Sequence, residues 1–112
     1  MPYIELKTNI KAQDSVPNLK SRFGQAISII PGKTERWLMV SVQDDIPMCF
    51  GGSDDPCAIA TVSLFGSASR SDYDKMTHAL TEIIKEETGI SADRIYIKYE
   101  EVSTWGYGGA NF

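Results

Sequence analysis

A strand–helix–strand pattern that occurs twice constrains the fold of this chain more than any other feature. In the first copy, residues 3–8 favour one strand and residues 37–42 favour another. Between them, apolar side chains recur at the spacing of one helical face, and Pro31-Gly32 ends that helix. The apolar stripe consists of Leu19, Phe23, Ala26, Ile27 and Ile30. This half of the chain therefore predicts two strands joined by a helix.

The second copy follows the same plan. Residues 57–65 carry no charged side chain, which predicts a strand buried on both faces. After a loop over residues 66–69, a second helical stripe is formed by Tyr73, Met76, Leu80, Ile83 and Ile84. Residues 95–102 then favour the last main strand.

Polar and glycine residues predict where the two helices begin and end. Ser15 is the expected N-cap of the first helix, with Pro17 in its first turn. Ser71 and Asp74 resemble a capping box at the start of the second helix, although Asp replaces the usual Glu or Gln. Gly89 stands where a helix is expected to end in a left-handed residue.

Two such units predict an α/β (α+β) fold with a four-stranded mixed sheet and both helices on one face. Helical connections of this length favour parallel pairing within each unit, through right-handed crossovers. A chain of 112 residues is enough for one domain, spanning residues 1–112. We expect apolar side chains on the opposite sheet face, and their burial would require oligomerisation. The Gly-rich and aromatic segment 103–112 is a candidate contact with a partner subunit.

Charge and hydropathy exclude several classes of function. The net charge of −4 argues against nucleic acid as a partner, because phosphate-binding proteins usually carry a basic surplus. No apolar run approaches the roughly 20 residues that insert across a membrane, and the first residues lack the apolar core of a signal peptide. We therefore expect a cytoplasmic protein, in which Cys49 and Cys57 remain thiols.

The N-terminus is a candidate reagent. A small residue such as Pro2 after the initiator Met1 favours removal of that methionine, which exposes a secondary amine. An α-amine has a pKa near ~8, and both burial and nearby cations lower it. An amine of this kind can remove a proton next to a carbonyl group as a general base. Alone, however, the dipeptide far more often marks a rigid first residue before a strand.

Several short motifs support a specific assignment. They are Met1-Pro2, Thr8-Asn9, Val16-Pro17, Gly32-Lys33, Phe-Gly-Gly-Ser-Asp-Asp-Pro-Cys-Ala over residues 50–58, Asp-Arg-Ile-Tyr-Ile over residues 93–97, and Asn111-Phe112. Together they resemble the macrophage migration inhibitory factor family of the tautomerase superfamily, over nearly the whole chain. The resemblance implies a homotrimer of βαββαβ subunits around a central channel, with active sites at subunit boundaries. It also implies keto–enol tautomerisation of α-keto acids such as phenylpyruvate, without a cofactor.

The resemblance assigns roles to individual residues. Pro2 matches the catalytic base, and Lys33 matches the residue that binds the substrate carboxylate. Phe65 stands where the family commonly has Ile and where the backbone N–H helps to hold the substrate. Trp105 and Tyr107 correspond to hydrophobic residues at the rim of the pocket, or alternatively to packing between subunits.

Two further positions lie on the last strand. Tyr96 matches the aromatic side chain that the neighbouring subunit supplies, and alternation along residues 95–99 puts Tyr96 and Lys98 on the face away from the helices. Lys98 replaces the Asn often found there. Lys98 is either a second cation in the site or a solvent-facing lysine paired with Glu100 or Glu101.

The sequence gives less support to other functions. The Cys-x-x-Cys pair to which thiol–disulfide exchange is credited in some members is incomplete, because Ala60 replaces the second cysteine after Cys57. His78 is the only histidine and has no Cys cluster nearby, so no metal site is expected. The main alternative to an enzyme is a cytokine-like protein that binds a receptor, exported without a signal peptide, in which catalysis is incidental.

Overall fold

The computed structural model describes residues 1–112 and confirms the two strand–helix–strand units. The four main strands are β1 (Pro2–Thr8), β2 (Met39–Gln43), β3 (Ala58–Phe65) and β4 (Ile95–Val102). They form one sheet in the order β2-β1-β3-β4. β1 pairs with β2 and β3 pairs with β4 in parallel, whereas the central strands β1 and β3 are antiparallel. The sheet is therefore mixed, as predicted.

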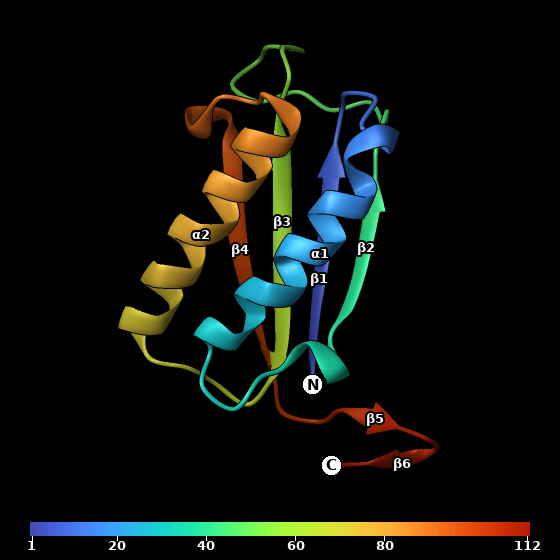
Figure 1. Cartoon of the computed structure of the whole chain (residues 1–112), viewed down its shortest axis with the longest axis vertical. Helices are drawn as coiled ribbons and strands as arrows, with labels where there is room; N and C mark the ends of the chain where they lie inside the picture. Colours follow the sequence, from blue (N-terminus) through green and yellow to red (C-terminus); the bar gives the residue numbers. More distant parts are fainter.

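Both helices cover the same face of this sheet (Figure 1). α1 (Val16–Ala26) belongs to the first unit and α2 (Arg70–Thr88) to the second. Short 3₁₀ turns extend the connections at Gln13–Ser15, Ile27–Ile29, Glu35–Trp37 and Ala92–Arg94. The final residues form a small hairpin, β5 (Gly106–Tyr107) and β6 (Ala110–Asn111).

The core lies between the helices and the sheet. Seventeen buried apolar residues from both units form one cluster, so the two units fold around a common interior. Both predicted helical stripes contribute to it, for example through Phe23 and Leu80. β3 corrects the prediction of a strand buried on both faces, because its burial alternates strictly from Ala58 to Phe65. Its Thr and Ser residues face the uncovered side of the sheet, where polar side chains remain hydrated.

The uncovered face of the sheet is mainly polar, which corrects the expectation of an apolar surface. A shallow depression there is lined by Tyr3, Glu5, Lys7, Ile59, Thr61, Ser63, Lys98 and Glu100. Lys7 pairs with Glu5 at 3.5 Å and Lys98 with Glu100 at 3.4 Å. Apolar burial of this face is therefore not a physical reason for oligomerisation.

The structure moves the start of the second strand and the N-cap of the second helix, and it confirms the end of that helix. The second strand begins at Met39, because Glu35–Trp37 forms a 3₁₀ turn that excludes Trp37 from the sheet. The cap of α2 is Ser69, whose hydroxyl accepts a hydrogen bond from the Asp72 N–H at 3.1 Å. Gly89 ends α2 with φ of 76°, as predicted.

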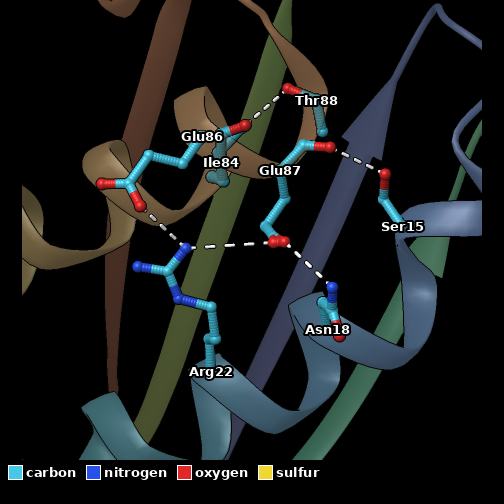
Figure 2. A network of polar contacts seen from close by, with 7 residues as sticks. All are labelled: Ser15, Asn18, Arg22, Ile84, Glu86, Glu87 and Thr88. Atoms are coloured by element: carbon cyan, nitrogen blue, oxygen red, sulfur yellow. Dashed lines mark hydrogen bonds and ion pairs between the residues drawn. The ribbon is translucent and has the colours of Figure 1, made fainter.

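Ser15 stands at the N-cap position of α1, as predicted, but its hydroxyl does not cap the helix. It donates to the Glu87 carbonyl near the end of α2, at 2.7 Å. Asn18 and Arg22 of α1 also bind α2, through the carboxylates of Glu87 and Glu86 (Figure 2). The start of α1 is thereby attached to the end of α2 by polar contacts outside the core.

Replacing Ser69 tests the revised cap. We expect Ser69→Ala to lower the free energy of unfolding by about 1 kcal/mol, because an N–H of the first turn loses its acceptor. Ser71→Ala is the matched control and should have a clearly smaller effect. Urea unfolding followed by circular dichroism measures both. A larger loss for Ser71→Ala would restore the cap predicted from the sequence.

Candidate active site

The N-terminus lies where the start of β1 meets the end of β3. Pro2 is buried and pairs with Leu64 on the neighbouring antiparallel strand. The Phe65 N–H donates a hydrogen bond to the Met1 carbonyl at 3.2 Å, which extends this ladder by one residue. The sheet thus fixes the terminal residues on a central strand rather than leaving them as a free tail.

Lys33 approaches the same point from the turn after α1. Gly32 adopts φ of 80°, and the Lys33 N–H closes the turn on the Ile30 carbonyl at 3.1 Å. The Lys33 ammonium then donates to the Phe65 carbonyl at 2.9 Å. Pro2, Lys33 and Phe65, which the resemblance assigns to one site, are therefore adjacent.

The terminal amine has unusual electrostatics. Burial lowers the pKa of the Met1 α-amine, and the positive charge of Lys33 and a hydrogen bond with Lys33 lower it further. All three causes favour the neutral amine, in which the nitrogen lone pair is free. At neutral pH, a larger fraction of the Met1 α-amine is therefore unprotonated than of an ordinary α-amine.

A cavity of about 550 Å³ opens beside the N-terminus. Three short segments line it: Met1, Pro2 and Tyr3; Arg36, Trp37, Leu38 and Met39; and Trp105, Gly106 and Tyr107. Seven of these ten residues are hydrophobic and none is acidic, so the lining suits a ligand with an apolar body and a negative charge. Trp105 and Tyr107 are thus among the residues that line this cavity.

An aromatic wall bounds this region. We define it as Trp37, Phe65, Trp105, Tyr107 and Phe112. The Trp37 and Tyr107 rings meet edge-to-face with centroids 5.1 Å apart, and Phe112 lies 6.1 Å from Phe65 and 6.5 Å from Tyr107. The hairpin β5–β6 brings the C-terminal aromatics here through a turn at Gly108-Gly109, both at positive φ.

Sequence reasoning missed four residues of this region. Arg36, Trp37 and Met39 line the cavity, and Phe112 was recognised only as part of a family ending. No sequence signal marked Arg36 and Trp37, because the 3₁₀ turn at Glu35–Trp37 brings them to the cavity beside the N-terminus. The aromatic side chains of the tail were the one available signal.

Tyr96 and Lys98 lie away from this cavity within the chain. Pro2 pairs with Leu64, whereas Tyr96 pairs with Ile59, five residues earlier on β3. At about 3.3 Å per residue this separates them by roughly 17 Å along the sheet. Tyr96 is 59% exposed, and Lys98 forms its ion pair with Glu100. One subunit alone therefore does not bring Tyr96 to Pro2.

The Gly-Gly-Ser motif has a structural explanation. The Arg94 guanidinium donates to the carbonyls of Phe50, Ser53, Asp55 and Pro56 at 2.9–3.2 Å. The Phe50 ring contacts Tyr96, with centroids 4.7 Å apart. Asn9 accepts from the Cys57 N–H at 2.9 Å. The segment is thus the anchored turn before β3, and it supports the exposed Tyr96 ring.

Other candidate chemistry finds no support in the geometry. No group of three or more His, Cys, Asp or Glu residues is arranged to hold a metal ion. Cys49 is exposed and Cys57 is buried, and both are free thiols. No helix has the length and apolar character needed to cross a bilayer.

Comparison with known proteins decides the family. The family model described as macrophage migration inhibitory factor matches residues 1–112. The chain belongs to this family. D-dopachrome decarboxylase of Gallus gallus is 30% identical over 109 residues, covering 96% of this chain and 92% of that protein. Macrophage migration inhibitory factor of Meriones unguiculatus is 31% identical over 117 residues, covering 100% of this chain and 99% of that protein.

Solved structures of the macrophage migration inhibitory factor family share the fold. The crystal structure of Leishmania major MIF2 superposes with a TM-score of 0.92 at 30% identity, covering 100% of this chain and 97% of that one. The homologue from Prochlorococcus marinus gives a TM-score of 0.82 at 28% identity, with 98% of each chain covered. The family assignment also places the chain in the tautomerase superfamily.

Proposed function

We propose that this protein is a keto–enol tautomerase of phenylpyruvate-like α-keto acids, in which the Pro2 amine is the general base once Met1 has been removed. The observation that carries the proposal is the amino end of the chain beside Lys33: burial and that cation lower the pKa of the Met1 α-amine, and we expect them to act in the same way on the Pro2 amine that Met1 removal exposes. The adjoining cavity supports it, because its aromatic and acid-free lining suits an arylpyruvate anion.

The proposed reaction moves one proton in two steps. The neutral Pro2 amine removes a proton from the carbon next to the keto group, and the C–H electron pair forms the enolate. The resulting ammonium then protonates the enolate oxygen, which yields the enol and restores the amine. Lys33 binds the carboxylate and stabilises the enolate charge. Enolisation of phenylpyruvate by the Met1-free protein, followed by ultraviolet absorbance, tests this function.

Met1 removal has a second consequence in this scheme. The Phe65 N–H currently donates to the Met1 carbonyl, so loss of Met1 deprives this donor of its partner. A buried or half-buried N–H without an acceptor favours a ligand oxygen in its place. The same cleavage therefore supplies both the base and a donor for the substrate.

We further propose a homotrimer with active sites at the subunit boundaries. Tyr96 supports this arrangement, since its exposed ring is braced by Phe50 and lies far from the Pro2 of its own chain. A second subunit has to supply it if it acts on the substrate. The polar face of the sheet is compatible with a water-filled central channel.

Mixed trimers test the shared site. We expect Pro2→Gly and Tyr96→Ala homotrimers each to be impaired, and co-expressed mixtures to regain part of the activity, because some boundaries then combine an intact Pro2 with an intact Tyr96. Differently tagged chains allow the mixed species to be purified, and light scattering should give three times the 12.4 kDa subunit mass. Tyr96→Ala activity equal to wild type would remove Tyr96 from the site.

A second candidate function is cytokine-like signalling through a receptor, favoured by the names of several relatives. This role requires export from the cell, whereas the proposed enzyme does not. A Pro2→Gly protein that still inhibits macrophage migration fully would favour signalling. Loss of both properties together would favour the enzyme.

A further inference from the structure

Arg36 is the only charged side chain that lines the cavity, and it has no acidic partner. It lines the same space as Pro2, but none of the ion pairs of the chain includes it. Its neighbour Glu35 is directed elsewhere, against α1, where its carboxylate fills the space that a side chain at Gly24 would need. Because no lining residue is acidic, the Arg36 charge is left for a ligand.

The orientation of Arg36 suits recognition of an anion. Its guanidinium lies 5.1 Å from the centre of the Trp37 ring, within the range of a cation–π contact. Trp37 is itself braced by Tyr107. A cation–π contact uses none of the guanidinium N–H groups, and two of them can bind a carboxylate with parallel hydrogen bonds.

Lys33 and Arg36 lie in different parts of the site. Lys33 binds the Phe65 carbonyl at the end of β3 and lies next to the terminal amine. Arg36 belongs to the 3₁₀ turn at Glu35–Trp37, whose Trp37 begins the aromatic wall. A ligand that satisfies both needs an acidic group at each end and a flat apolar body between them.

We propose that Arg36 binds a second acidic group of the substrate, so that the site prefers aromatic α-keto acids with a further carboxylate on the ring. This inference rests on the proposed tautomerase function for its kinetic test, but the binding preference is independent of catalysis. A cavity of about 550 Å³ is large enough for a ligand of this size.

The kinetic test compares phenylpyruvate with 4-carboxyphenylpyruvate. Wild type should have the higher kcat/KM for the ring carboxylate, and Arg36→Gln should lower the ratio of the two kcat/KM values about fivefold. Arg36→Lys keeps the positive charge but cannot form the two parallel hydrogen bonds of a guanidinium, so it should give an intermediate ratio of the kcat/KM values. Lys20→Gln is the matched control, since it removes the same charge from an exposed position of α1, and its ratio should equal that of wild type.

A binding test separates this inference from the proposed function. Fluorescence of Trp37 and Trp105 is titrated with terephthalate and with benzoate, neither of which can enolise. Tighter binding of terephthalate that is lost in Arg36→Gln supports the inference even if no tautomerase activity is found. Equal affinity for the two acids in wild type, or an unchanged ratio in Arg36→Gln, overturns the inference even if phenylpyruvate is a good substrate.

Discussion

Removal of Met1 is expected to raise the rate of phenylpyruvate enolisation by at least about 100-fold, the lower end of what a positioned general base contributes. With Met1 present, the Pro2 nitrogen belongs to an amide and has no basic lone pair. The Met1 carbonyl also occupies the Phe65 N–H. Protein with and without Met1, distinguished by intact mass, should therefore differ in kcat, through the missing base, and in KM, through the blocked donor.

Pro2→Gly in the Met1-free form provides the matched comparison. It keeps an α-amine at the start of β1 but loses the fixed ring of proline, so we expect activity between those of the Met1-free wild type and the Met1-retained form. Thermal unfolding of all three proteins checks that the fold is intact. Equal turnover with and without Met1 would exclude the N-terminal amine as the base.

The fold was largely predictable because each main element carries its own period. The stripe that includes Phe23 marks one helix, and the alternation of Ile4 and Leu6 with polar residues marks the first strand. Position 89 favours glycine because its φ is left-handed, a conformation that costs other residues free energy. These signals are local, and the tertiary packing agrees with them.

The errors arose where neighbouring residues offered equivalent signals. Ser69 and Ser71 are both acceptable caps, and only the position of the first helical turn selects Ser69. Trp37 is a favourable strand residue, but a 3₁₀ turn places its ring in the cavity wall instead. The uncharged stretch of β3 suggested burial on both faces, although Thr61 and Ser63 are readily accommodated beside water.

The candidate site was predictable only in part. The juxtaposition of Pro2, Lys33 and Phe65 followed from the resemblance, since residues 2, 33 and 65 show no common period. Arg36 and Phe112 were missed because their positions depend on a 3₁₀ turn and on the terminal hairpin. Such irregular connections are set by tertiary contacts, and hydrophobic periodicity does not reveal them.

Lys33→Ala is expected to lower kcat/KM for phenylpyruvate about tenfold to 100-fold at neutral pH, through loss of a charge-assisted bond to the substrate carboxylate and enolate. It should also change the pH dependence. After burial, the Lys33 charge is the next cause that lowers the pKa of the Met1 α-amine, and we expect loss of that charge to raise the pKa of the Pro2 amine in the Met1-free protein. A base with a higher pKa is protonated over a wider acidic range. The acidic limb of the kcat/KM profile should therefore move to higher pH.

Lys33→Arg separates these effects from the structural contact. The ammonium of Lys33 binds the Phe65 carbonyl at 2.9 Å, so Lys33→Ala also loosens the end of β3. Arginine keeps the positive charge while changing that contact, and its acidic limb should remain near that of wild type. If Lys33→Ala lowers activity but leaves the limb in place, Lys33 acts on the substrate alone. If both variants move the limb equally, position 33 acts through the conformation of the sheet end, because only one of them has lost the charge.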